Sequence, residues 1–255
     1  MMAFPGFSLE GKIMLVTGAG KGIGRGIAIA AAQMGADVLL NSRTRSDLEG
    51  VAAEIRATGG KVEPVVFDIS KMDEVARGAQ EAIDVWGRVD VLVNNAGTNR
   101  PKPALEVTEE DWDAIHDLNL KGLFFLTQRL VKPMIERKSG KIINIASTMG
   151  LVGGPLRTVY SASKGGVVLL TKGLAVEWAP YNVTVNAVAP AFTRTPLANV
   201  LLQRKEFYED VVRRIPMGRV GEVDEVVGAV LFLASEAANW ITGQTIAVDG
   251  GWVAW

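Results

Sequence analysis

The sequence predicts an α/β fold with one doubly wound parallel sheet. Apolar segments of strand length alternate with segments of helix length along all 255 residues. The strand segments are almost entirely apolar, which is typical of parallel strands covered by helices on both faces. The connections are short, and no linker, repeat or low-complexity segment interrupts them. We therefore expect a single domain over residues 1–255, with a seven-stranded parallel sheet and helices on both faces.

The strands and helices alternate in a regular order. The predicted strands are Lys12–Thr17, Asp37–Leu40, Val62–Phe67, Val89–Val93, Lys141–Ile145, Val183–Val188 and Thr245–Val248. The predicted helices are Gly22–Met34, Ser46–Thr58, Met72–Trp86, a long one near Glu109–Glu136, one that begins near Tyr160 and runs through Gly165–Trp178, and two stretches near Pro196–Arg213 and Val223–Ala234.

The composition excludes several classes of function. The net charge is −1, which gives no electrostatic footprint for nucleic acid. There is no cysteine, so disulfides, thiolate nucleophiles and cysteine-bound zinc are excluded, and we predict no metal site. No signal peptide and no run of about 18 apolar residues is found, so we expect a cytoplasmic protein without a membrane span. His116 is the only histidine and lies well before any candidate nucleophile, which disfavours a serine–histidine–aspartate triad.

A glycine-rich turn follows the first predicted strand and opens the first helix, with the sequence Thr17-Gly18-Ala19-Gly20-Lys21-Gly22-Ile23-Gly24. Glycines keep such a turn tight and let backbone amides approach a pyrophosphate, whose charge the helix N-terminus favours. The spacing is Thr-Gly-x-x-x-Gly-x-Gly rather than G-x-G-x-x-G. Its place in the chain predicts a nucleotide site in a Rossmann-type domain, and a merely tight turn is the alternative. The cofactor half would be about 1–150, and the catalytic and substrate half about 140–255.

The end of the second predicted strand bears on the choice of cofactor. It carries Ser42 and Arg43, and no carboxylate appears before Asp47. An acid at this place binds the ribose 2′-hydroxyl of NAD, whereas a base accommodates the 2′-phosphate of NADP. Lys21 in the glycine turn adds a second positive charge for that phosphate. We predict NADP(H) as the preferred cofactor and keep NAD(H) as possible, because a solvated Arg43 is the alternative.

Tyr160 and Lys164 lie four residues apart at the predicted start of a helix. Residues at this spacing share a helix face, so the phenol and the ammonium are expected to point the same way. A nearby positive charge favours phenolate, so we expect Lys164 to lower the pKa of Tyr160 from its ordinary value of about 10. Such a pair is suited to general acid/base catalysis on a carbonyl or alcohol. A surface tyrosine beside an extended lysine is the alternative.

Together the motifs resemble those of the short-chain dehydrogenase/reductase family over essentially the whole chain. The matches are the glycine turn, Asp68 after the third strand, Asn94-Asn95-Ala96-Gly97 after the fourth, Asn119 in the long helix, Ser147 after the fifth, and Tyr160-x-x-x-Lys164. Ser147 lies thirteen residues before Tyr160, as the family pattern requires. One of these motifs alone is weak, whereas the ordered set is highly specific.

The resemblance implies an enzyme that interconverts a secondary alcohol and a ketone, with the hydride carried by the cofactor. Tyr160 would exchange the proton and Ser147 would hydrogen-bond the reacting oxygen. Lys164 would hold the nicotinamide ribose and lower the pKa of Tyr160, and Asn119 would anchor a water that links Lys164 to solvent. Asp68 would bind the adenine, with a helix N-cap as its alternative. The predicted cofactor-binding residues are Gly18, Gly20, Lys21, Gly22, Ile23, Gly24, Ser42, Arg43, Asp68, Ile69, Asn95, Ala96, Gly97, Tyr160, Lys164, Pro190, Thr193 and Thr195.

The segment after the sixth strand departs from the family pattern. The family usually has Pro-Gly where this chain has Pro190-Ala191. Alanine costs stability there only if the position needs a positive φ. The resemblance also implies that Thr193 and Thr195 contact the nicotinamide amide, and that residues 192–207 form a mobile substrate lid.

The substrate is less sharply predicted than the reaction. The chain resembles both 3-oxoacyl-carrier-protein reductases and sugar-acid dehydrogenases such as gluconate 5-dehydrogenase. An enzyme that binds an acidic carrier protein needs basic residues near the cleft. Of the two family positions for this role, one carries the basic Lys138, but the other carries Tyr181, which is not basic. The terminus Asp249–Trp255 resembles the sugar-acid group. Arg157 is a candidate for binding a carboxylate, or else a solvated loop arginine.

We therefore favour a small polar substrate, such as a sugar acid or polyol, bound by Ser147, Arg157 and Tyr160. A 3-oxoacyl-carrier-protein reductase is the alternative, and a non-catalytic nucleotide sensor is a third. The stretches Leu118–Ile135 and Gly165–Trp178 are apolar almost all round, so a symmetric partner would cover what the sheet does not. Family members commonly pair these helices, which predicts a homotetramer through residues around 109–136 and 160–178. Burial within a thick single domain is the alternative.

Overall fold

Seven parallel strands form one sheet in the order β3-β2-β1-β4-β5-β6-β7. The structure is a computed structural model that describes residues 5–254, so Trp255 lies outside it. The strands are β1 (Ile13–Thr17), β2 (Asp37–Ser42), β3 (Val62–Val66), β4 (Val91–Asn94), β5 (Gly140–Ile145), β6 (Val183–Pro190) and β7 (Thr245–Val248). The chain runs outward from β1 to β3, crosses back, and runs outward again from β4 to β7. The predicted doubly wound parallel sheet is confirmed.

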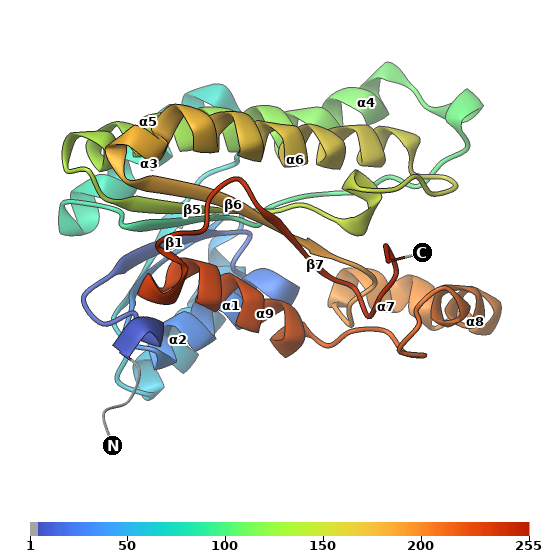
Figure 1. Cartoon of the computed structure of the whole chain (residues 1–255), viewed down its shortest axis with the longest axis horizontal. Coiled ribbons are helices and arrows are strands. Elements are labelled where there is room, and N and C mark those ends of the chain that lie inside the picture. Colours follow the sequence, from blue (N-terminus) through green and yellow to red (C-terminus); the bar gives the residue numbers. More distant parts are fainter. Residues whose placement is uncertain (1–4, 255) are drawn as a thin grey trace.

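Helices cover both faces of this sheet (Figure 1). On one face lie α1 (Gly22–Gln33), α2 (Arg45–Ala57) and α9 (Val223–Ala234), and on the other α3 (Met72–Trp86), α5 (Leu123–Glu136) and α6 (Thr158–Trp178). Each layer encloses its own large apolar core, because side chains that alternate along the central strands point to opposite faces. β1 is buried at every position, as its apolar sequence predicts. None of the helices described is both long and apolar enough to cross a bilayer.

The long helix predicted near Glu109–Glu136 is three segments. They are α4 (Glu109–His116), a π-helical stretch (Asp117–Gly122) and α5. At the end of the π-helical stretch, a Cβ on Gly122 would lie 2.0 Å from the Ile69 carbonyl oxygen, so only glycine fits here. π-helical turns are rare and occur frequently at functional sites. This one holds Asn119, which is completely buried.

The stretch predicted near Pro196–Arg213 is two short helices, α7 (Pro196–Leu202) and α8 (Lys205–Arg213). They project beyond the C-terminal end of the sheet, next to the end of the chain (Figure 1). This segment has a small apolar core of its own, composed of Leu202, Val211, Ile215 and Val220, with Phe192, Phe207 and Trp252 packed against it. The segment that contains the expected lid residues 192–207 therefore packs separately from the two main cores.

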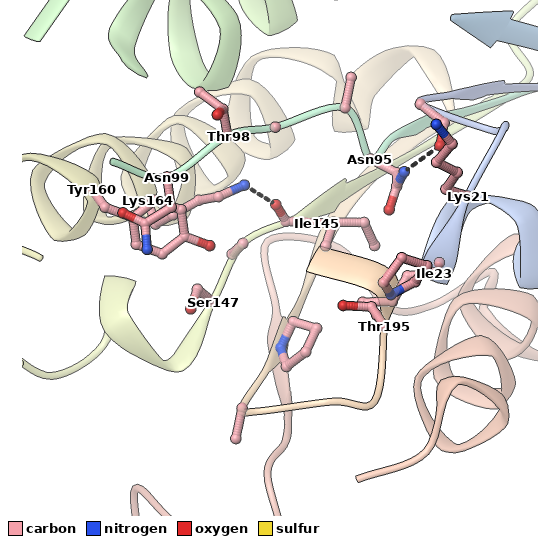
Figure 2. Close-up of a pocket in the computed structure, with 18 residues that line it drawn as sticks. Lys21, Ile23, Asn95, Thr98, Asn99, Ile145, Ser147, Tyr160, Lys164 and Thr195 are labelled. Carbon is pink, nitrogen blue, oxygen red and sulfur yellow. Dashed lines mark hydrogen bonds between the residues drawn. The ribbon is translucent and has the colours of Figure 1, made fainter. Parts of the chain in front are cut away.

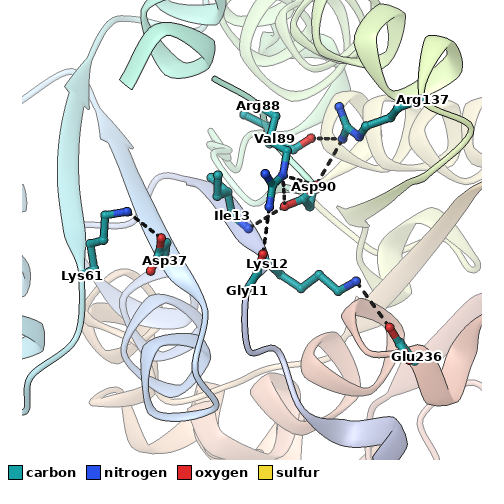
Figure 3. Close-up of polar contacts among 10 residues, drawn as sticks. All are labelled: Gly11, Lys12, Ile13, Asp37, Lys61, Arg88, Val89, Asp90, Arg137 and Glu236. Atoms are coloured by element: carbon teal, nitrogen blue, oxygen red, sulfur yellow. Dashed lines mark hydrogen bonds and ion pairs between the residues drawn. The ribbon is translucent and has the colours of Figure 1, made fainter. Parts of the chain in front are cut away.

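Several ion pairs lie at the amino ends of the strands, opposite to the end of the sheet that carries α7 and α8 (Figure 3). The Asp90 carboxylate accepts hydrogen bonds from the Ile13 amide at 2.9 Å and from Arg88 Nε at 3.0 Å, and it lies 3.6 Å from Arg137. Lys61 pairs with Asp37 at 2.8 Å. These contacts join neighbouring strands at their amino ends, so they stabilise the sheet on the side away from the carboxyl ends, where ligands bind in such folds.

Candidate active site

The main cleft lies at the carboxyl ends of β1, β4, β5 and β6, where the strand order reverses (Figure 2). Doubly wound sheets bind their ligands at this switch point. The cleft has a volume of about 360 Å³ and is lined by both the glycine turn and the Tyr160–Lys164 segment. A second cavity of about 450 Å³ continues toward the ends of β2 and β3 and shares Gly18, Lys21, Ala96 and Gly97 with the first. Together they form a path long enough to join the two predicted halves of the site.

The glycine turn has the backbone that its sequence predicts. Gly18 and Gly22 have φ of +63° and +55°, in the left-handed region that favours glycine. A Cβ on Gly24 would lie 2.3 Å from the Gly18 carbonyl oxygen. The Asn95 side chain holds the turn in place by donating to the Thr17 and Gly18 carbonyls at 2.8 and 3.2 Å. No side chain caps α1, which leaves its first amides directed at the cleft.

The end of β2 carries the predicted 2′-phosphate residues. Ser42, Arg43 and Thr44 line the second cavity, and Arg43 is exposed and forms no ion pair among the described residues. Lys21 is not free, because its ammonium pairs with Asp47 at 3.0 Å. The mouth of this cavity therefore presents one unpaired positive charge and one that is shared with a carboxylate.

Asp68 and Ile69 also line the second cavity, at the end of β3. The Asp68 Oδ1 atom accepts hydrogen bonds from the Ser70 amide and hydroxyl at 2.9 and 2.7 Å. The alternative interpretation of Asp68 as a helix cap is wrong, because α3 begins after Lys71. Asp68 instead stabilises the turn that leads into α3 and keeps its carboxylate at the cavity wall.

Tyr160, Ser147 and Lys164 all line the main cleft (Figure 2). Tyr160 and Lys164 lie in the first two turns of α6, and Ser147 follows the end of β5. The Lys164 Nζ atom donates to the Ile145 carbonyl at 2.6 Å and lies 5.9 Å from the centre of the Tyr160 ring. The structure thus brings the three groups to one cavity from the end of β5 and the start of α6.

The expected lowering of the Tyr160 pKa by Lys164 is wrong for this structure. Burial is the largest influence and raises the pKa of Tyr160, while the Ser147 hydroxyl and the Arg157 charge partly oppose it. Lys164 does not oppose it, because its own pKa is about 8, so it has lost its positive charge before the phenol ionises. Burial also lowers the pKa of Lys164 to about 8. The phenol is therefore held protonated at neutral pH, as a proton donor must be.

Asn119 supports the cleft from behind instead of lining it. Its Nδ2 atom donates to the Thr98 carbonyl at 2.9 Å and to the Ser163 hydroxyl at 3.1 Å, and its Oδ1 accepts from the Thr98 amide at 2.8 Å. A Cβ on Gly97 would lie 3.2 Å from this Oδ1 and 3.5 Å from Lys164 Nζ, so both groups face Gly97. The side chain therefore fixes the loop after β4 against α6. That Asn119 anchors a water next to Lys164 stays a prediction.

The chain is similar to known proteins over almost its whole length. A family model described as Enoyl-(Acyl carrier protein) reductase matches residues 18–253. The 3-oxoacyl-[acyl-carrier-protein] reductase FabG of Thermotoga maritima is 42% identical over 245 residues, which are 96% of this chain and 99% of the relative. The 2-dehydro-3-deoxy-D-gluconate 5-dehydrogenase of Escherichia coli is 39% identical over 255 residues, which are 99% of this chain and 100% of the relative.

A solved structure gives the same result. The crystal structure of a gluconate 5-dehydrogenase from Burkholderia cenocepacia in complex with NADP and tartrate has a TM-score of 0.96 and 37% identity, and each chain is covered completely. This chain belongs to the short-chain dehydrogenase/reductase family. It is an oxidoreductase of that family, and its relatives include both sugar-acid dehydrogenases and carrier-protein reductases.

Two of the residues that the family pattern places at the nicotinamide lie apart here. Thr195 lines the main cleft and caps α7, accepting from the Ala198 amide at 3.2 Å. Thr193 is buried, donates to the Ala191 carbonyl at 3.2 Å, and lines a different cavity beneath the lid. Pro190 and Ala191 both line the main cleft. Ala191 does not have a positive φ, so the replacement of the family glycine causes no backbone strain.

Arg157 does not line the main cleft of this family member but a neighbouring cavity of about 640 Å³. Its guanidinium carbon lies 5.3 Å from the centre of the Phe192 ring and 6.0 Å from that of Phe207. Trp252 lines the same cavity, which places the end of the chain beside the lid. The structure thus places Arg157, three residues before Tyr160, in an aromatic cavity beside the cofactor cleft and not in the cleft itself.

Several residues of the cleft were not predicted from the sequence, namely Thr98, Asn99, Ile145, Ala146 and Pro196. Thr98 and Asn99 directly follow Asn94-Asn95-Ala96-Gly97, so they could have been predicted by extending that loop by two residues. The Asn99 Oδ1 atom is buried in the cleft wall without a hydrogen-bond partner among the described residues. Buried acceptors without partners are rare in native proteins. This atom and the space left by the glycine turn fit a bound dinucleotide.

Proposed function

We propose that the protein interconverts a secondary alcohol and a ketone, with Tyr160 as general acid/base. The observation that carries this proposal is the convergence of Tyr160, Ser147 and Lys164 on the cleft that begins at the glycine turn. A nucleotide sensor needs the glycine turn but has no use for a protonated phenol beside a hydroxyl. Residues of about 1–150 would bind the cofactor, and residues of about 140–255 would carry catalysis and substrate binding.

The chemistry divides between cofactor and chain. The nicotinamide, when bound, supplies or accepts the hydride. In the reductive direction the Tyr160 hydroxyl donates its proton to the carbonyl oxygen, and in the oxidative direction the phenolate takes the proton of the alcohol. The Ser147 hydroxyl hydrogen-bonds the same oxygen and favours the charge that develops on it. Lys164 would hold the ribose hydroxyls of the cofactor at the cleft wall.

NADP(H) is the cofactor that the charges favour. Arg43 is free at the end of β2, and Lys21 is close by. A 2′-phosphate brings negative charge and strong acceptor oxygens that such groups bind well. The gluconate 5-dehydrogenase structure with 37% identity contains NADP. NAD(H) is the weaker candidate, because Arg43 follows β2 directly and the nearby carboxylate of Asp47 is already paired with Lys21.

The proposed substrate is a small polar hydroxy or keto compound, such as a sugar acid or polyol. Sugar-acid dehydrogenases are 39% to 41% identical to the chain. A 3-oxoacyl-carrier-protein reductase is the second candidate, because such enzymes reach 42% and 43% identity. An acidic carrier protein needs basic residues at its docking surface. Of the two family positions for this role, Lys138 is basic and exposed, but Tyr181 is not basic.

Replacing Tyr160 by phenylalanine tests the reaction. We expect Tyr160→Phe to lower kcat by at least about 100-fold, since general acid/base catalysis typically contributes that much or more. NADPH binding, followed by titration of cofactor fluorescence, should change little because the ring is kept. Turnover that survives in this variant would refute the assignment of the proton donor. A panel of sugar acids, polyols and 3-oxoacyl thioesters, followed through the absorbance of the reduced nicotinamide, would separate the two substrate classes.

The proposed assembly is a homotetramer that works in the cytoplasm. Leu169 and Val176 on α6 are 69% and 77% exposed in the single chain, and Phe125 on α5 is partly exposed as well. An apolar groove of about 460 Å³ lies between these helices, lined by His116, Leu120, Lys121, Phe124, Gly166 and Leu170. A second copy of the same face is the simplest cover for such a surface.

A further inference from the structure

Arg157 differs from the other arginines of residues 5–254. Most of them pair with a carboxylate within 4 Å, and those that do not are Arg43, Arg45, Arg129, Arg157, Arg204 and Arg213. Of these six, only Arg157 is not exposed. Its one polar contact within the described chain is a hydrogen bond to the Pro155 carbonyl at 3.3 Å. A half-buried cation without a counterion is costly, so such groups usually have an anionic partner.

The surroundings of Arg157 form a cavity of the size that binds small molecules. The cavity has a volume of about 640 Å³, within the usual range for ligand pockets. Its apolar wall is composed of Met149, Leu156, Phe192, Phe207 and Trp252. Its charged groups are Arg157, Arg213, Arg214 and Asp210, and Asp210 is already paired with Arg214 at 3.0 Å. The cavity lining thus carries three positive charges and one negative charge, which favours the binding of an anion in the cavity.

The backbone fixes Arg157 relative to the catalytic phenol. Leu156 has a φ of +62°, in the left-handed region that a branched side chain rarely adopts. The Lys102 amide donates to the Leu156 carbonyl at 3.0 Å and holds this conformation. Arg157 then occupies the N-cap position of α6, with Tyr160 in the first turn. Strained backbone of this kind persists where the surrounding structure requires it, often at ligand sites.

The charge of Arg157 reaches the active site. It acts on Tyr160 to favour the phenolate, against the effect of burial. The guanidinium carbon lies 5.3 Å from the Phe192 ring centre and 6.0 Å from that of Phe207, within cation–π range. Apart from the hydrogen bond to the Pro155 carbonyl, its N–H groups are left for a ligand. A carboxylate matches a guanidinium in a bidentate geometry.

We propose that Arg157 binds the carboxylate of the substrate in this aromatic cavity, so that the enzyme selects hydroxy and keto acids over neutral polyols and over acyl thioesters. The inference rests on the proposed oxidoreductase function and specifies its substrate class. The aromatic cavity adjoins the main cleft, since Ala191 of the cleft is followed by Phe192 of the cavity and Ser147 lies two residues before Met149. The carbon bearing the reacting oxygen would lie at Tyr160 and Ser147, with the acid end in the aromatic cavity. A neutral acyl chain would leave the Arg157 charge buried without a partner.

The test compares Arg157→Gln with the wild type on three matched compounds: D-gluconate, its uncharged amide, and sorbitol. We expect Arg157→Gln to raise KM for the acid roughly 10- to 100-fold, as loss of a charge-assisted bond implies, with a smaller change in kcat. The values for the amide and for sorbitol should stay nearly constant. Arg157→Lys should recover part of the preference for the acid. Arg45→Gln is the matched control, because Arg45 is exposed, unpaired among the described residues and outside the cavity lining.

Three results would overturn the proposal. The first is an equal kcat/KM of the wild type for the acid and its amide. The second is an Arg157→Gln variant that prefers the acid over the amide as strongly as the wild type does. The third is an equal loss of kcat/KM for the acid and for sorbitol in that variant, which would indicate a structural role. If no compound is turned over, carboxylate binding at Arg157 is tested separately by the thermal shift of the NADP+ complex. Gluconate or tartrate should raise Tm in the wild type and not in Arg157→Gln, and equal shifts in both would refute the subsite. Failure of the oxidoreductase function itself appears differently, as the absence of turnover of every compound by the wild type, and failure of the Tyr160 assignment appears as turnover that survives Tyr160→Phe.

Discussion

The protonation states of Tyr160 and Lys164 determine the chemistry of the cleft at a given pH. Burial raises the pKa of Tyr160, so the phenol is protonated throughout the neutral range and beyond. Burial lowers the pKa of Lys164 to about 8, so its ammonium begins to lose its proton just above neutrality. The same desolvation thus acts in opposite directions on the two groups, since it disfavours the charged form of each. The raised pKa of Tyr160 favours proton donation, and the lowered pKa of Lys164 weakens the positive charge at the cleft wall.

These shifts predict a pH profile for ketone reduction. Below pH 8 both groups carry their protons, and the reductive kcat/KM for NADPH should be flat as far as Tyr160 and Lys164 determine it. Above about pH 8 Lys164 becomes neutral, so kcat/KM should fall by about tenfold per pH unit, because this parameter reports on the free enzyme. Steady-state kinetics from pH 6 to 10 would measure it. A profile that stays flat to pH 10 would show that Lys164 keeps its proton.

At the scale of elements, the turn between β1 and α1 depends on the absence of one methyl group. A Cβ on Gly24 would lie 2.3 Å from the Gly18 carbonyl oxygen and 2.4 Å from Asn95 Nδ2. Gly24→Ala should therefore open the turn, cost roughly 1–3 kcal/mol of unfolding free energy, and weaken NADPH binding. Denaturant unfolding and cofactor titration measure the two effects.

The matched control for Gly24→Ala is Gly50→Ala. Gly50 lies in the interior of α2 and is exposed, and a Cβ added to it would meet no other atom within 4 Å. Alanine at such a position should stabilise the protein by about 0.5–1 kcal/mol and leave cofactor binding unchanged. If Gly24→Ala behaved like this control, the close packing at the turn would not be what makes the glycine necessary.

The sequence predicted those features that depend on neighbours along the chain. The strands, the glycine turn and the shared helix face of Tyr160 and Lys164 follow from local spacing, and the structure contains each of them. The direction of the Lys164 ammonium did not follow, because the Ile145 carbonyl that binds it belongs to a different element. The π-helical stretch at Asn119 depends on contact between Gly122 and Ile69, residues far apart in the chain. The contact of Arg157 with the Phe192 and Phe207 rings likewise joins residues that lie far apart in the chain.

At the scale of the whole molecule, α5 and α6 each have a second face that the sheet does not use. One side of α6 buries Val167, Thr171, Leu174 and Ala175, and the other exposes Leu169 and Val176. The helix is apolar on both sides, which in a globular protein is typical of a helix with two packing partners. Tyr160 and Lys164 lie at the start of the same helix. Any partner that covers the outer face therefore also restrains the helix that carries Tyr160 and Lys164.

This arrangement predicts that assembly and activity are linked. The double variant Leu169→Glu/Val176→Glu places charges on the exposed apolar face, so we expect a smaller species by light scattering, a lower Tm and reduced kcat/KM. Val200→Glu is the control, because Val200 is also exposed and apolar but lies on α7, away from that face, and the assembly should stay intact. A double variant with the mass of the wild type would contradict the predicted interface. A smaller species with full activity would keep the interface but show that α6 holds Tyr160 and Lys164 in place without a partner.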